Sequence, residues 1–327
     1  MKNKKILVIF TGGTIAMVND EHTMKSVMSS GNTQLQSALN DVFKEIEIKF
    51  IEHSYYPSPY MTPQNMFNIC KLIEHETKHT NYDGIVITHG TDTIEESAYF
   101  LDLYFKMETP IVFTGAMRNL SELGYDGLSN VVSSILVAAD DQSKNRGVLL
   151  VMNDEINAAR EVTKTHTVAL DTFKSLEFGP LGVVDSSRVF FYRANNYTKP
   201  NFTITKLTKR VDIIKSATGV DDLVLNFLVD QKVDGIVIEA LGRGNVPPMM
   251  VHGIERAIKN GISVVITSRC PKGRVFDTYA YTGGGYHLKQ LGCLFSGNLP
   301  SQKARILLML ALESAQDKTD LFKYFEH

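Results

Sequence analysis

Short apolar runs recur along the chain, and each one ends in glycine, threonine, serine or asparagine. They are too short for helices, rich in β-branched residues and not alternating, which is typical of strands buried on both faces of a parallel sheet. The runs cover residues 6–10, 84–88, 110–115, 147–153, 235–242 and 262–268. The pattern therefore predicts a mostly parallel sheet.

Amphipathic segments lie between these runs and predict helices. The helical segments are 62–79, 92–105, 249–261 and 301–314. The first has Thr62 as a candidate N-cap and Pro63 at the first helical position, and the second carries a capping box, Thr93-x-x-Glu96. The alternation of strand and helix predicts a doubly wound α/β fold with right-handed crossovers.

One stretch interrupts this alternation. Residues 188–212 mix aromatic residues, asparagine, proline and cations without a helical period, and the strand–helix pattern resumes after them. We therefore predict a larger N-terminal α/β domain over residues 1–187, a linker over 188–210 and a smaller C-terminal α/β domain over 211–327.

Composition and charge indicate an ordinary globular protein and exclude some classes of partner. The 327 residues are 43% hydrophobic and 21% charged, which is ordinary for a globular protein, and the length is consistent with two domains. The net charge of −2 provides no basic field, so we expect neither nucleic acid nor an acidic membrane as a partner. No stretch approaches the ~20 apolar residues of a membrane span.

The cysteines and the N-terminus bear on the compartment. Cys70, Cys270 and Cys293 are far apart and form no Cys-x-x-Cys motif, so neither a disulfide framework nor a zinc site is predicted. The first apolar run ends at Phe10, which makes it shorter than the roughly 7–15 residues of a secretion signal core. We therefore expect a cytoplasmic protein with reduced thiols.

Two of the turns that follow predicted strands are rich in hydroxyl groups. Residues 11–14 read Thr-Gly-Gly-Thr, and residues 88–93 read Thr-His-Gly-Thr-Asp-Thr. Ligands of open parallel sheets bind outside the carboxyl ends of the strands. A threonine becomes a nucleophile only with a base and an oxyanion site nearby, and Thr91, Asp92 and Lys164 are suited to form a proton relay.

Each of these features also has a simpler interpretation. The 11–14 turn can be an ordinary strand-to-helix turn, Asp92 can cap the next helix, and Lys164 can be a solvated surface lysine. His89 and His166 have no second ligand at metal spacing, so we expect no metal. A dinucleotide-binding oxidoreductase needs a Gly-x-Gly-x-x-Gly loop after the first strand, and this chain has none there.

The motifs acquire a specific meaning when they are read together and in order. They are TGGTIA (11–16), THGTDTIEESAYFLDL (88–103), FTGAMR (113–118), DGLSN (126–130), RGVLLVMND (146–154), REVTKTHT (160–167) and FKSLEFGPLG (173–182). In this order they resemble the bacterial-type L-asparaginase family, and most of all its type II branch. The resemblance extends from about residue 5 to residue 312.

This resemblance implies a chemistry. The family hydrolyses the side-chain amide of L-asparagine to L-aspartate and ammonia, with neither a metal nor an organic cofactor. By resemblance, Thr14 is the nucleophile that forms an acyl-enzyme. Thr91, Asp92 and Lys164 correspond to the hydroxyl, carboxylate and lysine set that activates a threonine or a water molecule.

The resemblance also implies how the substrate is held. Asp92 corresponds to the residue that binds the α-ammonium group, and Ser58 to one that binds the α-carboxylate. Backbone groups that stabilise the oxyanion and orient the amide are implied at Gly90, Thr91 and Ala116. Asn245 corresponds to an asparagine from a neighbouring subunit, so we expect a homo-oligomer, typically a tetramer built as a dimer of dimers.

Departures from the family pattern cluster around the predicted lid. The family has a tyrosine in the loop after TGGTIA, but residues 17–33 contain none. We expect this segment to close over the substrate and exclude water. The candidate replacements for the hydroxyl are Ser26, Ser29, Ser30, Tyr55, Tyr56 and Tyr60. Pro59 stands where a glutamine is common, and Tyr279 and Tyr281 are candidates for a glutamate of the neighbouring subunit.

Three alternatives stay open at this stage. The first is a glutaminase-asparaginase, an enzyme with a broader amide specificity. It stays open because the departures from the family pattern affect the substrate preference more than the reaction. The asparaginase-like subunit of an archaeal tRNA-dependent amidotransferase normally carries an extra N-terminal domain and a basic surface. A non-catalytic amino-acid-binding α/β protein has no need of Thr14, Thr91 and Lys164 together.

Overall fold

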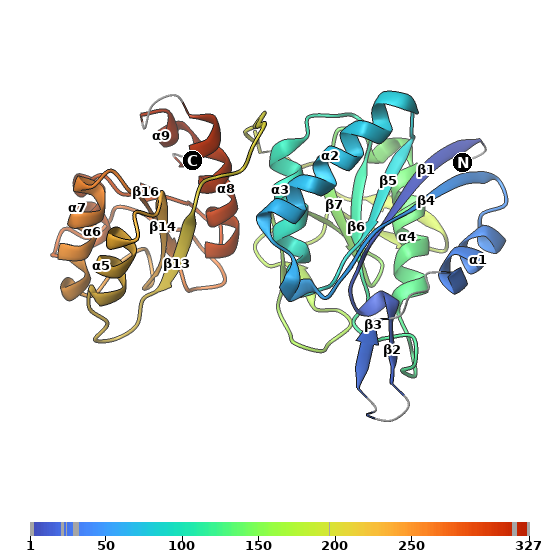
Figure 1. Ribbon diagram of the computed structural model, residues 1–327, viewed down its shortest axis with the longest axis horizontal. Coiled ribbons are helices and arrows are strands. Elements are labelled where there is room, and N and C mark those ends of the chain that lie inside the picture. The colour runs from blue at the N-terminus through green and yellow to red at the C-terminus, as the bar shows by residue number, and fades with distance from the viewer. Residues whose placement is uncertain are drawn as a thin grey trace. The chain divides into compact units, whose positions relative to one another are not determined.

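The computed structural model (Figure 1) describes residues 3–20, 23, 25–28, 33–195, 197–315 and 319–325. The chain divides into two units, Met1–Lys199 and Pro200–His327, and each is described by itself. The division falls within the range 188–210 that we predicted as a linker. The first four residues of that range are instead a strand of the N-terminal sheet, because they pair with the strand before them.

The N-terminal unit is built on an eight-stranded sheet with the order β12-β11-β8-β7-β6-β5-β1-β4. The strands from β4 to β7 are parallel, and β8, β11 and β12 continue the sheet in antiparallel pairing. This is the mostly parallel sheet that the sequence predicts. The strands are β1 (Lys4–Gly12), β4 (Ile46–Tyr56), β5 (Gly84–Thr88), β6 (Ile111–Thr114), β7 (Val148–Met152), β8 (Glu155–Ala158), β11 (Gly182–Asp185) and β12 (Arg188–Phe191).

Helices cover both faces of this sheet (Figure 1). Ile6, Val8 and Phe10 of β1 share a buried cluster with side chains of α1 and α4. Leu7 and Ile9, which alternate with them, are also fully buried, because α2 and α3 lie over the other face (Figure 1). Burial on both faces explains why this strand reads as a continuous apolar run. The helices are α1 (Thr33–Val42), α2 (Pro63–His79), α3 (Ile94–Tyr104) and α4 (Gly127–Ala139).

The starts of α2 and α3 test the predicted caps. Thr62 caps α2 as predicted, because its side chain accepts a hydrogen bond from the Asn65 N–H (3.2 Å). The capping box predicted for α3 is wrong. The hydroxyl of Thr93 is turned towards the neighbouring segment, where it donates to the carbonyl of Ser58 (2.9 Å), and it makes no side-chain cap on α3.

Short elements complete the N-terminal unit. One antiparallel hairpin joins β2 (Met17–Asn19) to β3 (Ser26–Met28), and a second joins β9 (Val162–Lys164) to β10 (Phe173–Ser175). Figure 1 shows the β2–β3 hairpin projecting away from the sheet. The 3₁₀ turns are η1 (Thr14–Ala16), η2 (Ser58–Tyr60) and η3 (Asp141–Ser143).

The C-terminal unit is a smaller α/β domain with a parallel four-stranded sheet in the order β13-β14-β15-β16. Ile236, Ile238 and Ile266 share a buried cluster with α5 and α6, and α8 covers the opposite face. The elements are β13 (Val211–Lys215), α5 (Leu223–Asp230), β14 (Gly235–Ala240), η4 (Pro248–Met250), α6 (Val251–Lys259), β15 (Ser263–Ser268), α7 (Gly285–Leu291), β16 (Leu294–Phe295), α8 (Ser301–Ser314) and α9 (Thr319–Phe325). Within the part of the chain that the structure describes, no helix is long and apolar enough to span a membrane.

Candidate active site

The two hydroxyl-rich turns, residues 11–14 and 88–93, lie at the same edge of the sheet because they follow two neighbouring strands. Strands β1 and β5 are parallel and pair up to Phe10 and Thr88, so both turns leave the sheet at its carboxyl edge. Gly13 has φ +87°, and a Cβ added there lies 2.4 Å from the Gly90 Cα. Only glycine fits this contact between two backbones, which brings the turn before Thr14 directly against the turn of Gly90.

Thr14 begins the short 3₁₀ turn η1 and is half-buried. The turn is closed by the Ala16 N–H, which donates to the Gly13 carbonyl (3.0 Å). The hydroxyl of Tyr125 donates to the Ile15 carbonyl (3.0 Å), and burial raises the pKa of this phenol. Thr14 therefore stands on a turn whose backbone is fixed from two sides.

Lys164 joins the second turn to the β9–β10 hairpin. Its Nζ donates to Thr91 Oγ1 (2.9 Å) and to Asp92 Oδ1 (2.7 Å). The Asp92 side chain is 59% exposed and that of Lys164 only 15%, while Thr91 is buried. The structure thus brings together the three residues of the predicted relay, with the lysine between the hydroxyl and the carboxylate.

Ser58 and Gly90 lie directly beside this group. The Asp92 N–H donates to Ser58 Oγ (3.2 Å), and a Cβ added to Gly90 lies 2.6 Å from the Ser58 Cβ. The absence of a side chain at residue 90 therefore lets the turn close on the buried Ser58. A pocket of ≈ 340 Å³ opens next to the group, and its lining includes Asp92 and Lys164.

His89 supports the turn from inside the protein. It is completely buried, with Nδ1 2.8 Å from the Gly90 carbonyl and Nε2 2.9 Å from Ser97 Oγ. Because a carbonyl only accepts, Nδ1–H donates to it and the Ser97 hydroxyl donates to Nε2. Burial lowers the pKa of His89 to about 4, so the imidazole is neutral at pH 7. No group of metal-binding side chains occurs among the described residues.

Ala116, predicted at the third strand end, is fully buried and is held by residues that the sequence analysis did not assign. Asn130 Nδ2 donates to the carbonyl of Gly115 (3.0 Å). Asp126 accepts from the Met117 N–H (3.0 Å to Oδ2). The motif DGLSN contains both side chains, so its place in the ordered set of motifs was the signal that could have identified them.

Glu95 is a third residue beside the site that the sequence did not reveal. It is buried, lines the pocket beside Asp92, and accepts a hydrogen bond from Thr163 Oγ1 (3.1 Å). Thr163 immediately precedes Lys164, so this bond fixes the hairpin that carries the lysine. A carboxylate in the first turn of α3 looks like an ordinary helix-start residue, because the sequence gives no sign of its burial.

The predicted lid is described only in part. Residues 21, 22, 24 and 29–32, and with them the candidates Ser29 and Ser30, lie outside the described residues. Ser26 accepts a hydrogen bond from Asn119 Nδ2 (2.7 Å), and the same amide group donates to Asn19 Oδ1 (2.8 Å). Asn119 therefore ties the two strands of the hairpin, and Ser26 is engaged in this contact.

The tyrosine candidates are near the end of β4. Tyr55, Tyr56 and Tyr60 all have exposed side chains. The carbonyl of Tyr56 accepts from the Gly13 N–H (3.1 Å), so the backbone of this residue contacts the glycine turn. Which hydroxyl replaces the family tyrosine stays a prediction.

Asn245 belongs to the C-terminal unit. Its Oδ1 accepts from the Gly285 N–H (3.2 Å), which connects its turn to the start of α7. Tyr279 and Tyr281, the other candidates in this unit, stack with ring centroids 5.6 Å apart. Their predicted relation to a site in a neighbouring subunit stays a prediction.

Comparison with known proteins shows the family of this chain. The family model described as "Asparaginase, N-terminal" matches residues 5–197, and the one described as "Glutaminase/Asparaginase C-terminal domain" matches residues 210–325. The chain belongs to the asparaginase family. The two matches cover nearly the whole chain, and the unmatched residues 198–209 include the division between the two units.

Individual members of the asparaginase family are similar over their full length. "L-asparaginase 2" of Escherichia coli (strain K12) is 37% identical over 98% of this chain and 92% of its own. "L-asparaginase" of Bacillus licheniformis is 34% identical over 96% of this chain and 97% of its own. The crystal structure of "Probable Cytoplasmic L-asparaginase" from Campylobacter jejuni has a TM-score of 0.89, 31% identity and 99% coverage of both chains.

Proposed function

We propose that this protein is an L-asparaginase, which hydrolyses L-asparagine to L-aspartate and ammonia. The observation that supports it best is the position of Lys164 Nζ, 2.9 Å from the hydroxyl of Thr91 and 2.7 Å from the carboxylate of Asp92. This cluster lies beside the glycine turn that leads to Thr14. The names of the similar proteins support the same substrate.

In the first step, Thr14 Oγ attacks the side-chain amide carbon of asparagine. A new C–O bond forms, the C–N bond breaks, and the nitrogen leaves as ammonia after it receives the hydroxyl proton through a proton carrier. The product is an aspartyl ester of Thr14. A covalent intermediate of this kind divides one difficult hydrolysis into two easier steps.

In the second step, water hydrolyses this ester. The water oxygen bonds to the acyl carbon, the bond to Thr14 Oγ breaks, and the threonine regains its proton. We assign proton transfer to Thr91 and Lys164. Their hydrogen bond gives a proton a direct path between the hydroxyl of Thr91 and the amine of Lys164, and Asp92 holds the lysine in place. Lys164 can accept a proton only when its amine is neutral. The lysine must therefore pass on the proton that it carries before it accepts one from Thr91.

The substrate's charged groups match the residues around the pocket. The exposed carboxylate of Asp92 is available for the α-ammonium group. Ser58 Oγ accepts from the Asp92 N–H, which leaves the hydroxyl hydrogen of Ser58 to be donated to the α-carboxylate. Backbone groups at Gly90, Thr91 and Ala116 complete the proposed set by orienting the amide and its oxyanion.

The exposed face of α5 bears on the assembly of the protein. Leu223, Val224 and Phe227 of α5 are exposed, and an apolar face of this kind is typical of a protein interface. It supports a homo-oligomer, for which we propose a dimer of dimers with Asn245 reaching a neighbouring site.

We propose that the segment 17–33 closes over the bound substrate. A cytoplasmic location is the reading favoured by the name of the Campylobacter protein.

Glutamine hydrolysis is the second candidate function. The family model that matches residues 210–325 is named for both glutaminase and asparaginase. The departures at Pro59 and in the lid lie around the α-amino end of the substrate and its cover, where they bear on the preference between the two amino acids. We therefore propose a glutaminase side activity that is weaker than the asparaginase activity.

Ammonia release from equal concentrations of L-asparagine and L-glutamine tests the proposal. We expect catalytic turnover with asparagine and slower turnover with glutamine. Faster turnover with glutamine would make the protein a glutaminase-asparaginase. Binding of asparagine without release of ammonia would show a non-catalytic amino-acid-binding protein and refute the proposal.

A further inference from the structure

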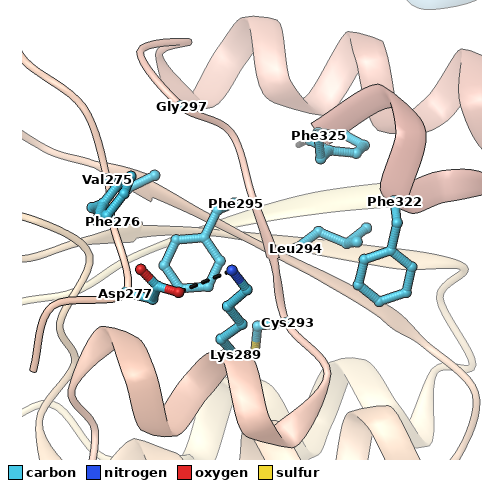
Figure 2. A pocket seen from close by; sticks show the side chains of 10 residues that line it. All are labelled: Val275, Phe276, Asp277, Lys289, Cys293, Leu294, Phe295, Gly297, Phe322 and Phe325. Carbon is cyan, nitrogen blue, oxygen red and sulfur yellow. Dashed lines mark hydrogen bonds and ion pairs between the residues drawn. The ribbon is translucent and has the colours of Figure 1, made fainter. Parts of the chain in front are cut away.

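A second cavity lies within the C-terminal unit, and nothing in the proposed asparaginase mechanism uses it. Its volume is ≈ 440 Å³, within the range of small-molecule sites, roughly 300–1,000 Å³. We call it the aromatic pocket. It is bounded by the edge strand β16, the helices α7 and α9, and residues 275–277 (Figure 2).

Most of its wall is apolar. Phe295 comes from β16, and Phe322 and Phe325 come from α9 on the other side of the cavity (Figure 2). Leu294 and Cys293 add to the wall, and burial raises the pKa of the Cys293 thiol to about 12, so this sulfur stays uncharged. Rings in such an arrangement bind an aromatic or a large aliphatic group through their faces and edges.

One ion pair interrupts the apolar wall. Lys289 Nζ lies 2.9 Å from Asp277 Oδ2, and both side chains are partly exposed to solvent. The hydrogen bond from Lys289 lowers the pKa of the Asp277 carboxyl, so this carboxyl is ionised at pH 7, where a lysine side chain ordinarily carries its positive charge. Figure 2 shows this pair, joined by a dashed line, among the residues that line the pocket.

The two charges restrict which ligand fits. A ligand with only a negative charge meets the carboxylate of Asp277, and a ligand with only a positive charge meets the ammonium of Lys289. A zwitterion presents one charge to each of them, and charge-assisted hydrogen bonds of this kind are stronger than neutral ones. A polar side chain would lose its hydration among the phenylalanines without gaining a partner.

We propose that the aromatic pocket binds a free amino acid with a large apolar side chain, such as phenylalanine or leucine. The α-carboxylate binds Lys289, the α-ammonium group binds Asp277, and the side chain lies among Phe295, Phe322 and Phe325. The site is separate from the proposed asparagine site, because none of its lining residues is among those assigned to asparagine binding or catalysis.

Isothermal titration of the full-length protein with L-phenylalanine tests the proposal. We expect saturable binding of one molecule per chain. 3-Phenylpropionate lacks the ammonium group and 2-phenylethylamine lacks the carboxylate, so each should bind about tenfold more weakly or worse. Saturating L-aspartate should leave the binding of phenylalanine unchanged.

Two variants and a matched control locate the ligand. Lys289→Gln and Phe322→Ala should each weaken phenylalanine binding by about tenfold. Lys259→Gln neutralises a lysine of α6 that pairs with Glu255 outside the pocket, and should stay within about twofold of the parent protein. Phe322 is 39% exposed, so its truncation should preserve the fold, which thermal unfolding verifies.

Several results would overturn the proposal. They are the lack of saturable binding up to about 10 mM phenylalanine, equal binding of 3-phenylpropionate, unchanged affinity in Lys289→Gln and Phe322→Ala, and displacement by aspartate. The Thr14→Ala variant separates this proposal from the proposed asparaginase activity. It should bind phenylalanine as the parent protein does, whether or not it hydrolyses asparagine.

Discussion

The candidate active site and the aromatic pocket are built from different kinds of side chain. In the N-terminal unit, hydroxyls, a lysine and a carboxylate meet on turns that are held by backbone contacts and buried hydrogen bonds, as at Gly13 and His89. In the C-terminal unit, side-chain rings enclose a cavity with a single ion pair. The first arrangement fixes the atoms needed to move protons and stabilise charge, whereas the second provides surface for binding alone.

The difference predicts how each region responds to substitution. In the candidate active site, small changes should abolish chemistry because each group acts through its neighbours. In the aromatic pocket, a similar change should alter affinity by a moderate factor and leave asparagine hydrolysis intact.

Lys164→Met should have the largest effect. It removes the donor that joins Thr91 to Asp92 and keeps the length of the side chain, so we expect the rate of ammonia release to fall on the order of 10⁴-fold. Lys174→Met is the matched control, because Lys174 lies on the same hairpin and pairs with Glu155. Equal losses in both variants would mean that the hairpin, and not the relay, is responsible.

Gly13→Ala tests whether the glycine turn positions Thr14. Its added Cβ meets the backbone of Gly90 at 2.4 Å, so we expect a loss of more than about 3 kcal/mol in the free energy of unfolding and roughly 100-fold in activity. Gly179→Ala also has a positive φ, but nothing lies within 4 Å of its added Cβ. It should cost only about 1 kcal/mol, and a similar cost for both variants would refute the role of the close contact.

His89 makes stability depend on pH. Its pKa is about 4 in the folded protein, against a usual value of 6.5, so between these values the unfolded chain takes up a proton that the folded one refuses. The free energy of unfolding should therefore decrease as the pH falls from about 6.5 to 4, by up to about 3 kcal/mol. Urea unfolding at several pH values measures it, and His89→Gln should remove this part of the slope.

Ser58→Ala should have the smallest effect of the set. It removes the hydroxyl proposed to bind the α-carboxylate, so we expect KM for asparagine to rise roughly tenfold with little change in kcat. A fall in kcat at constant KM would instead assign Ser58 to the chemical step. Lys289→Gln in the aromatic pocket should leave both constants unchanged.

Much of the fold was predictable because the parallel strands are buried on both faces. The apolar runs at β1, β5 and β7 stand out in the sequence for this reason. The short strands β9 and β12 do not, because a strand of three or four residues has little room for a pattern. Residues 188–191 also contain aromatic residues with an exposed face, so they look like part of a linker.

The candidate site was predictable where its residues belong to contiguous motifs. Thr91 and Asp92 follow a strand. Lys164 lies 73 positions from Thr91, so the family resemblance was needed to favour its place in the relay over that of a solvated surface lysine. The burial of Glu95 and the contact of Thr93 with Ser58 arise only when separate segments pack together. The aromatic pocket is hidden in the same way, since α9 supplies part of its wall from the end of the chain.

The most direct test of the account is the rate of ammonia release from L-asparagine by the Thr14→Ala variant. Thr77→Ala is the matched control, because its hydroxyl donates to the Ile73 carbonyl within α2 (2.8 Å). The account predicts a loss on the order of 10⁴-fold for Thr14→Ala and an unchanged rate for Thr77→Ala. Full turnover by a correctly folded Thr14→Ala protein would contradict it.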